Sequence, residues 1–256
     1  LSTRAANMFR GWGIKKGDKV MLVLKRNYQY WYAILGLMKL GAIAIPATHM
    51  LTTKDFQYRF QAADVSAVIA TAHAEAAHYI DEADELLGDR HLRVKAIVNG
   101  THEGWHDFDS EIMQYPDTME RIPTRADELH LLYFTSGTTG YPKMVVHDHA
   151  YGLAHIQTAK HWQNVDPDGI HLTISDTGWA KAAWGKLYGQ MAMGTCVFVY
   201  DFDKFIPENM LKIMEKYRIT TFCAPPTMFR FFIKEGVGKY DLSSLKYCTI
   251  AGEALN

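Results

Sequence analysis

Short apolar runs alternate with segments of helical periodicity along most of the chain, and this alternation constrains the fold more than any other feature. In the first half, apolar runs that suit strands occupy residues 19–24, 42–45, 67–71 and 93–98. Helical patterns occupy 28–40, 52–62 and 75–87, and the second of these opens on a capping-box pattern, Thr52 with Asp55. A helix between two strands returns the chain to the same edge of a sheet, so that neighbouring strands run parallel. The pattern therefore predicts an α/β fold.

A polar stretch of weak periodicity, residues 100–127, follows the first half and contains Pro116 and Pro123. It predicts a boundary between two subdomains, 1–125 and 126–256. The second half resumes the alternation, with strands expected at 129–134, 144–147, 170–174, 195–200, 220–224 and 247–250 and helices at 151–162, 208–217 and 227–235. We therefore expect two mainly parallel β-sheets flanked by helices, with ligands bound at the carboxyl ends of the strands.

Charge and hydropathy exclude two classes of partner. The 256 residues carry a formal net charge of −1, which disfavours nucleic-acid binding because such proteins need a basic surface. Segment 30–48 is apolar, but Lys39 lies within it, Gly41 interrupts it and Pro46 ends it, so a helix and a buried strand are expected instead of a membrane span. The first residues lack a secretory signal pattern and begin in a helix without Met, so we expect a chain trimmed at both ends.

Cysteine and histidine spacing predicts no metal ligands. Cys196, Cys223 and Cys248 lie too far apart for a metal-ligand pair, and their odd number favours a reducing compartment, the cytoplasm, with the thiols buried as small apolar groups. Four histidines gather in one stretch without the acidic or cysteine partner that a zinc pattern needs: His147, His149, His155 and His161.

The segment most informative about chemistry is 133–143, Tyr-Phe-Thr-Ser-Gly-Thr-Thr-Gly-Tyr-Pro-Lys, at the end of an expected strand. Glycines let the backbone approach a ligand, successive N–H groups in such a turn form an anion-binding concavity, and hydroxyls add donors. Lys143 supplies a mobile positive charge for phosphate oxygens. The composition indicates a cradle for a polyphosphate, although a solvated hairpin turn would use the same residue types.

This loop is not a Walker A loop, which runs from Gly-Lys-Ser/Thr directly into a helix. Here Tyr141 and Pro142 separate Gly140 from Lys143, and an apolar strand follows. A P-loop kinase or GTPase is therefore disfavoured. A serine-hydrolase triad is disfavoured as well, because Ser136 does not lie in a nucleophile elbow.

Several segments together resemble the AMP-forming acyl and aryl ligases, the adenylate-forming superfamily of acyl-CoA synthetases, luciferases and adenylation domains. The phosphate-loop run 135–143 followed by 144–147 is similar to that family's signature in residue type and spacing. The same family is resembled by Gly17-Asp18-Lys19-Val20, by Lys39-Leu40-Gly41-Ala42 with Pro46, and by Ala251-Gly252-Glu253-Ala254-Leu255. The segment Ser175-Asp176-Thr177-Gly178-Trp179-Ala180-Lys181 resembles the acetyl-CoA and medium-chain acyl-CoA synthetase branch.

The resemblance implies roles for particular residues. It implies that the phosphate loop binds ATP, with Lys143 and Thr135 acting on the reacting phosphates: Thr135, Ser136, Gly137, Thr138, Thr139, Gly140 and Lys143. The backbone at Gly252, Glu253 and Ala254 would pack on the adenine, and Glu253 could accept from its amino group or lie near magnesium. Gly178, Trp179, Pro226 and Thr227 would line the acid pocket, with Trp179 as a wall or gate. His155, Lys181 and Lys186 are interpreted as helix or surface residues.

The implied reaction converts a carboxylic acid, a short- to medium-chain fatty acid or a similar one, to its acyl-adenylate with ATP and Mg²⁺ and then to a thioester with coenzyme A. The implied fold is the layered αβαβα arrangement of the family's N-terminal domain, incomplete here. Because the family's later motifs and lid domain would lie beyond residue 256, we expect this chain to be inactive alone. A non-catalytic ATP/AMP-binding module and an adenylation domain that loads a carrier-protein thiol remain as alternatives.

Overall fold

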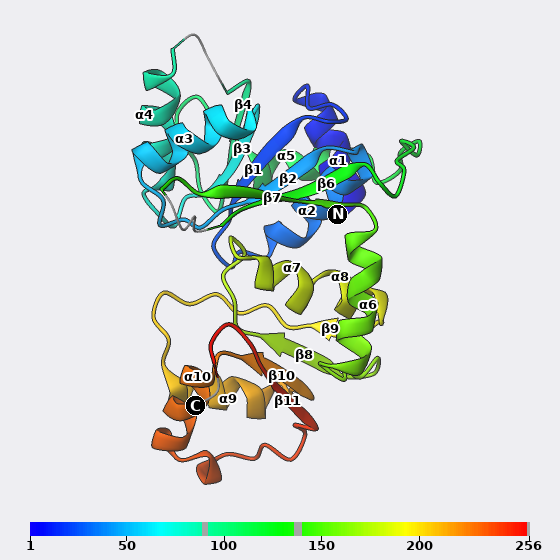
Figure 1. The fold of residues 1–256 in the computed structure, drawn as a ribbon, viewed down its shortest axis with the longest axis vertical. Coiled ribbons are helices and arrows are strands. Elements are labelled where there is room, and N and C mark those ends of the chain that lie inside the picture. The colour runs from blue at the N-terminus through cyan, green and yellow to red at the C-terminus, as the bar shows by residue number, and fades with distance from the viewer. Residues whose placement is uncertain (89–91, 136–139, 255–256) are drawn as a thin grey trace. The chain divides into compact units, whose positions relative to one another are not determined.

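A computed structural model describes residues 1–88, 92–135 and 140–254 of the chain (Figure 1). They divide into two compact units. Unit 1 comprises Leu1–Ala150 and Thr177–Trp179, and unit 2 comprises Tyr151–Asp176 and Ala180–Asn256. Each unit is built around its own β-sheet, as the alternating pattern predicts.

Unit 1 contains a seven-stranded sheet in the order β5-β4-β3-β1-β2-β6-β7. Its strands are β1 (Lys19–Val23), β2 (Ile43–Pro46), β3 (Ala67–Thr71), β4 (Val94–Val98), β5 (His106–Asp107), β6 (Leu129–Thr135) and β7 (Lys143–Asp148). The pairings are parallel, except that β6 and β7 form an antiparallel hairpin. Consecutive residues of β1, β2 and β3 are buried, which requires cover on both faces of the sheet because successive side chains point to opposite faces.

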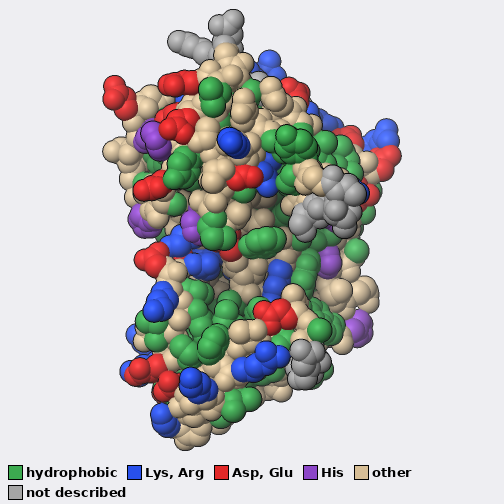
Figure 2. Space-filling model, turned by 60° about the vertical axis from the view of Figure 1, so that its left-hand side comes forward, with side chains coloured by type: hydrophobic (Ala, Val, Ile, Leu, Met, Phe, Trp, Pro, Cys, Tyr) green, Lys and Arg blue, Asp and Glu red, His purple; other side chains and the backbone are tan. Residues whose placement is uncertain are grey.

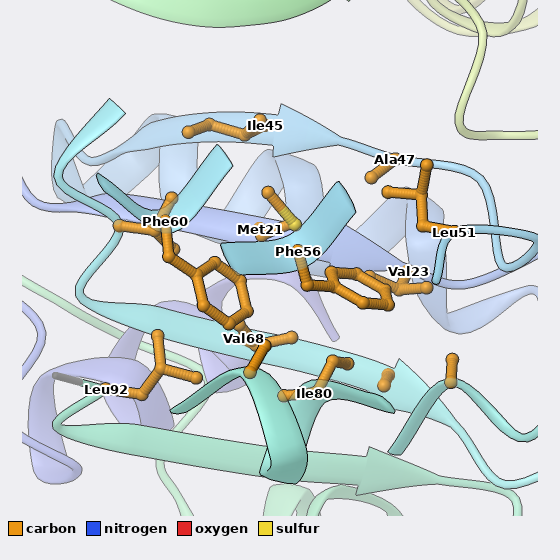
Figure 3. Close-up of a cluster of buried hydrophobic side chains, with 14 of the residues drawn as sticks. Met21, Val23, Ile45, Ala47, Leu51, Phe56, Phe60, Val68, Ile80 and Leu92 are labelled. Atoms are coloured by element: carbon orange, nitrogen blue, oxygen red, sulfur yellow. The ribbon is translucent and has the colours of Figure 1, made fainter. Parts of the chain in front are cut away.

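Helices supply that cover. They are α1 (Ser2–Gly11), α2 (Gln29–Leu40), α3 (Thr53–Ala63), α4 (Ala76–Leu86) and α5 (Phe108–Glu111), with a 3₁₀ turn η1 (Ile112–Gln114). α1 packs on α2, and α3 packs on α4. Figure 3 shows the core beneath α3 and α4, where the rings of Phe56 and Phe60 point into a cluster with Met21, Val68 and Ile80. Burial of this cluster fixes the position of α3, which contacts residues on both sides of the loop between β6 and β7.

Unit 2 contains a four-stranded parallel sheet in the order β11-β10-β8-β9. Its strands are β8 (Ile170–Thr173), β9 (Cys196–Val197), β10 (Thr221–Ala224) and β11 (Tyr247–Ile250). Its helices are α6 (Tyr151–His161), α7 (Ala180–Lys186), α8 (Tyr188–Ala192), α9 (Pro207–Lys216) and α10 (Pro226–Glu235), followed by η2 (Val237–Lys239). Phe222 and Phe232, 5.8 Å apart between ring centroids, join β10 to α10 in a core that includes Met210 and Leu211 of α9.

The structure places the division between the two units later than position 125. Strand β6 pairs with β2 through Leu131 and Ala44, and β7 extends the same sheet, so both strands belong to unit 1. The phosphate loop that joins them is therefore part of unit 1, although the sequence pattern assigned it to the second subdomain. The boundary between the units therefore follows the pairing of the strands, and it does not coincide with the loss of periodicity at 100–127.

The apolar segment 30–48 forms α2 and then β2, as expected. Across the described ranges, no helix has the length and apolar character needed to cross a membrane. On the face shown in Figure 2, Lys and Arg side chains are interspersed with Asp and Glu side chains, in keeping with the small net charge.

Candidate active site

The hydroxyl- and glycine-rich loop closes the β6–β7 hairpin of unit 1. Thr135 and Lys143 form the last pair of the ladder, and the Thr135 Oγ1 donates a hydrogen bond to the Lys143 carbonyl at 3.4 Å. Both side chains are exposed, so a hydroxyl and an ammonium flank the mouth of the loop. Gly140 has φ of +128° with open space where a Cβ would lie, so its backbone conformation is what favours glycine. The predicted ligands Ser136, Gly137, Thr138 and Thr139 lie outside the described residues.

Helix α3 contacts the part of this loop that leads into β7. The Tyr58 hydroxyl donates to the Pro142 carbonyl at 2.9 Å, and the Tyr58 ring stacks on Tyr141 at 4.7 Å between centroids and 17° between planes. The Arg59 guanidinium lies 5.2 Å from the centroid of Phe134, in β6 on the other side of the loop. These contacts join α3 to both sides of the loop. Nothing in the local sequence pattern of α3 indicates them, because Tyr58 and Pro142 are 84 residues apart.

Replacing Tyr58 by phenylalanine is expected to raise the KM for ATP, the nucleotide that the sequence resemblance implies, about two- to tenfold, because it removes the hydrogen bond to Pro142 but keeps the ring stack on Tyr141. The measurement is the KM in the full-length protein, with the melting temperature as a check on folding. Tyr79→Phe on α4 is the control, since the Tyr79 hydroxyl also has one partner, Glu75, away from the loop. Equal KM values for the two variants would contradict an anchoring role.

The segment 177–179 packs on the rest of unit 1. The Thr177 N–H donates to the Lys25 carbonyl at 2.8 Å, and its hydroxyl donates to the same oxygen. A Cβ on Gly178 would lie 2.3 Å from Thr48 N and 2.4 Å from Ala47 C. The backbone at 178 can therefore approach the backbone at 47–48 this closely only because the residue is glycine. The structure thus gives Gly178 a packing role that the sequence did not indicate.

Trp179 is 57% exposed, so it is not an ordinary core tryptophan. It lines a cavity of about 70 Å³ together with residues of β2, α3 and β6, of the segment between β2 and α3, and of its own segment: Pro46, Ala47, Thr48, Leu51, Arg59, Phe134 and Gly178. Phe134 directly precedes Thr135, so the predicted acid-pocket residues Gly178 and Trp179 share a cavity with the start of the phosphate loop. Ligand pockets typically enclose roughly 300–1,000 Å³, so this cavity alone is smaller than a substrate site.

The remaining predicted residues lie together in unit 2, at the carboxyl ends of β10 and β11. The Glu253 carboxylate accepts from the Thr227 N–H at 3.2 Å and from the Thr227 hydroxyl at 2.5 Å. These hydrogen bonds, and then the charges of Arg230 and Lys181, hold the pKa of Glu253 below its usual range. Gly252 has φ of +101°, which turns the chain after β11. Glu253 and Thr227, expected to serve adenine and acid respectively, are therefore direct partners at the start of α10.

Two sequence interpretations change with the structure. Cys196 and Cys248 are exposed and only Cys223 is buried, because β9 and β11 lie at the edges of their sheet. Lys186 is 4% exposed and donates to the Ser175 carbonyl at 2.6 Å, so it is a buried residue of α7 and not a surface one. His155 and Lys181 are helical as expected, in α6 and α7.

Histidine contributes to the core more than to the candidate site. His130 on β6 is fully buried and stacks on His149 at 4.9 Å between ring centroids. Burial, with a smaller contribution from His149, lowers the pKa of His130 to about 3, so its ring is neutral at physiological pH. Within the ranges that the structure describes, no three His, Cys, Asp or Glu side chains are grouped so that they could hold a metal ion.

The family model for AMP-binding enzymes matches residues 1–256, the full length of the chain. The chain belongs to the AMP-binding enzyme family. Among curated relatives of this family member, the mitochondrial acyl-coenzyme A synthetase ACSM3 of Homo sapiens is 32% identical over 257 residues, which cover 100% of the chain and 43% of the relative. The mitochondrial acyl-coenzyme A synthetase ACSM5 of Rattus norvegicus is 37% identical over 259 residues, with 100% and 44% covered. The chain thus spans less than half the length of these relatives.

Solved structures agree with this AMP-binding fold. An acyl-CoA synthetase from Brucella canis superposes with a TM-score of 0.87 at 25% identity, covering 100% of this chain and 46% of that one. The anthranilate CoA ligase AuaEII, solved in complex with anthranoyl-AMP, gives a TM-score of 0.88 at 23% identity, covering 99% and 49%. The second likeness establishes the fold alone. The predicted class, two mainly parallel sheets flanked by helices, is confirmed.

Proposed function

We propose that this chain carries the nucleotide-binding part of an AMP-forming acyl-CoA synthetase. In the first step a carboxylate oxygen of the acid bonds to the α-phosphorus of ATP, and the bond to the β-phosphate oxygen breaks and releases pyrophosphate. In the second step the thiol of coenzyme A loses its proton to solvent and its sulfur bonds to the acyl carbon of the adenylate, while the bond from that carbon to the phosphate oxygen breaks and AMP leaves. ATP enters as its magnesium complex, so the Mg²⁺ arrives with the substrate.

The observation that carries this proposal is the anchored hairpin loop of a family member, with Thr135 and Lys143 paired at its mouth. The attacking carboxylate is already ionised, so the first step needs no general base. It needs donors that follow negative charge onto the departing pyrophosphate. The Lys143 ammonium supplies one such donor, and the Thr135 hydroxyl supplies another when it rotates from the Lys143 carbonyl to the phosphate. Tyr58 holds the arm that bears Lys143. Ser136, Gly137, Thr138, Thr139 and Gly140 complete the proposed phosphate site.

In unit 2 we assign Gly252, Glu253 and Ala254 to the adenine and Pro226 and Thr227 to the acid. Because the Glu253 carboxylate is engaged by Thr227, it serves to order the turn against α10 and is not assigned to magnesium. Gly178 and Trp179 are assigned to the acid as well, with Trp179 presenting an exposed indole to an alkyl chain or a ring.

The acid that we propose is a short- to medium-chain fatty acid or a similar one. Supporting this choice, the curated relatives are named acyl-coenzyme A synthetases. Three free cysteines support a reducing compartment, and we propose the cytoplasm, although the curated relatives named above are mitochondrial.

The test is ATP–pyrophosphate exchange in the full-length protein that contains this chain, with acids of increasing length and benzoate, and with this chain as the paired sample. We expect exchange that depends on one size class of acid, followed by thioester formation when coenzyme A is added. We expect no exchange with this chain alone. ATP binding without exchange for any acid would replace the proposal with a non-catalytic nucleotide-binding module. Exchange without transfer to coenzyme A would favour a carrier-protein thiol.

A further inference from the structure

Lys181, in the first turn of α7, has a half-buried ammonium whose direct partner is uncharged. Its Nζ donates to the Ala251 carbonyl at 3.0 Å. In the described part of the chain this is its only hydrogen bond, and no carboxylate there lies within ion-pair distance of it. Burial is the largest influence and lowers the pKa of Lys181, whereas Cys223 and Glu253 oppose it from a longer range. Withdrawing an ammonium from water without a paired carboxylate costs free energy, so the position calls for a role beyond stability.

The contact fixes one particular peptide group. The Ala251 N–H donates to the carbonyl of Ala224, the last residue of β10, at 3.3 Å, and the Ala251 carbonyl accepts from Lys181. The N–H of Ala251 is therefore bonded to the sheet, and its carbonyl is bonded to α7. Gly252 follows with φ of +101°, so Ala251 is the last restrained residue before the chain turns.

Glu253, on the other side of Gly252 in the same turn, is also restrained by hydrogen bonds. Glu253 accepts two hydrogen bonds from Thr227 at the start of α10. The turn is thus tied to α7 through Lys181 and to α10 through Glu253, and the residue between the two ties is a glycine. Removing Lys181 would release the Ala251 carbonyl and leave the turn held by the Ala251 N–H on β10 and by Glu253 on α10.

We propose that Lys181 is a positioning residue of the nucleotide site, which fixes the turn 251–254 in the conformation that receives the adenine. The inference rests on the proposed function, in which Gly252, Glu253 and Ala254 contact the base. Lys181 itself touches neither base nor phosphate in this assignment. Its loss should weaken nucleotide binding and leave the chemical step nearly unchanged once ATP is saturating.

The test is Lys181→Met in the full-length protein, which keeps the length of the side chain and removes the ammonium. The Kd for AMP by calorimetry and the KM for ATP are both expected to rise about tenfold, the usual effect of losing a hydrogen bond to a charged group. The kcat at saturating ATP should stay within about twofold of wild type. Lys212→Met, on α9 of the same unit and paired with exposed Glu208, is the matched control and should change neither constant.

The pH dependence of AMP binding separates positioning from a general loss of structure. In wild type the affinity should weaken as pH rises through the lowered pKa of Lys181, below the usual lysine range, because the amine is a weaker donor than the ammonium. In Lys181→Met it should stay flat over the same range. Cys223 and Glu253, the titratable groups that act on Lys181, are present in both proteins, so the difference between the two profiles belongs to Lys181.

The outcomes distinguish this inference from the proposed function. An unchanged Kd for AMP in Lys181→Met, or a variant whose profile follows that of wild type, would overturn the inference. If the variant binds AMP more weakly while no acid supports exchange in wild type, the positioning role stands and the acid-activating function fails. If exchange occurs in wild type and the variant has a normal KM for ATP, the function stands and the inference fails.

Discussion

Replacing Lys143 by methionine is expected to lower the rate of acyl-adenylate formation about 10²–10³-fold, the usual effect of removing one donor from developing negative charge. Lys143 closes the last pair of the β6–β7 ladder, so its backbone is held at the mouth of the predicted phosphate loop and its side chain is exposed. Methionine keeps most of the apolar stem and removes only the charge. The KM for the acid should change little, because the lost interaction is made with pyrophosphate. The measurement is acid-dependent ATP–pyrophosphate exchange in the full-length protein.

Lys54→Met is the matched control, since Lys54 is an exposed lysine of α3 in the same unit, outside the loop. It should retain the wild-type rate of exchange. Both variants should melt at the wild-type temperature, because neither side chain is buried. A Lys143→Met protein with a rate close to that of Lys54→Met would remove Lys143 from the chemistry and leave the loop as a binding element only.

The sequence predicted those parts of the fold that local physics determines. The strands expected at 19–24, 67–71 and 93–98 correspond to β1, β3 and β4, because a run of apolar β-formers between turns carries its own signal. The capping box at α3 is confirmed, with the Thr52 N–H donating to Asp55 Oδ2 at 3.0 Å, since both partners lie within one turn. The class of fold follows from such local elements.

Helices α7 and α8 were not predicted, because close packing overrides their local preference. Gly189 is the second residue of the five-residue helix α8 and weakens its helical signal. In the structure a Cβ at Gly189 would lie 2.2 Å from the His155 carbonyl oxygen of α6, so the two helices approach closely only because this residue is glycine. A contact of this kind has no signature in the sequence of α8 itself.

The candidate site likewise has features that could be predicted from the sequence and features that could not. The phosphate loop could be found from its residues, because glycines, hydroxyls and a lysine at a strand end suit phosphate. Its anchor on Tyr58 and the tie between Lys181 and Ala251 could not, since they join residues 84 and 70 positions apart in the chain. Those positions come together through the pairing of β6 with β2 in one sheet and of β8, β10 and β11 in the other.

Gly178→Ala is expected to destabilise the protein by about 1–3 kcal/mol, the usual cost of overpacking, and to lower kcat/KM for the acid about tenfold or more. The new methyl group would lie 2.3 Å from the Thr48 nitrogen, and a backbone atom cannot move aside as a side chain can. The segment 177–179 would have to shift, which weakens the hydrogen bonds from Thr177 to Lys25 and displaces Trp179 from its cavity.

The measurements are the melting temperature and the kcat/KM for the preferred acid in the full-length protein. Gly238→Ala is the control, because a Cβ at Gly238 meets no atom within 4 Å and its φ is not in the left-handed region. The control should match wild type in both measurements. If Gly178→Ala also matched wild type, the segment 177–179 would tolerate displacement from Ala47 and Thr48. Trp179 would then have no fixed place in an acid pocket, and the assignment of that pocket to this segment would have to be abandoned.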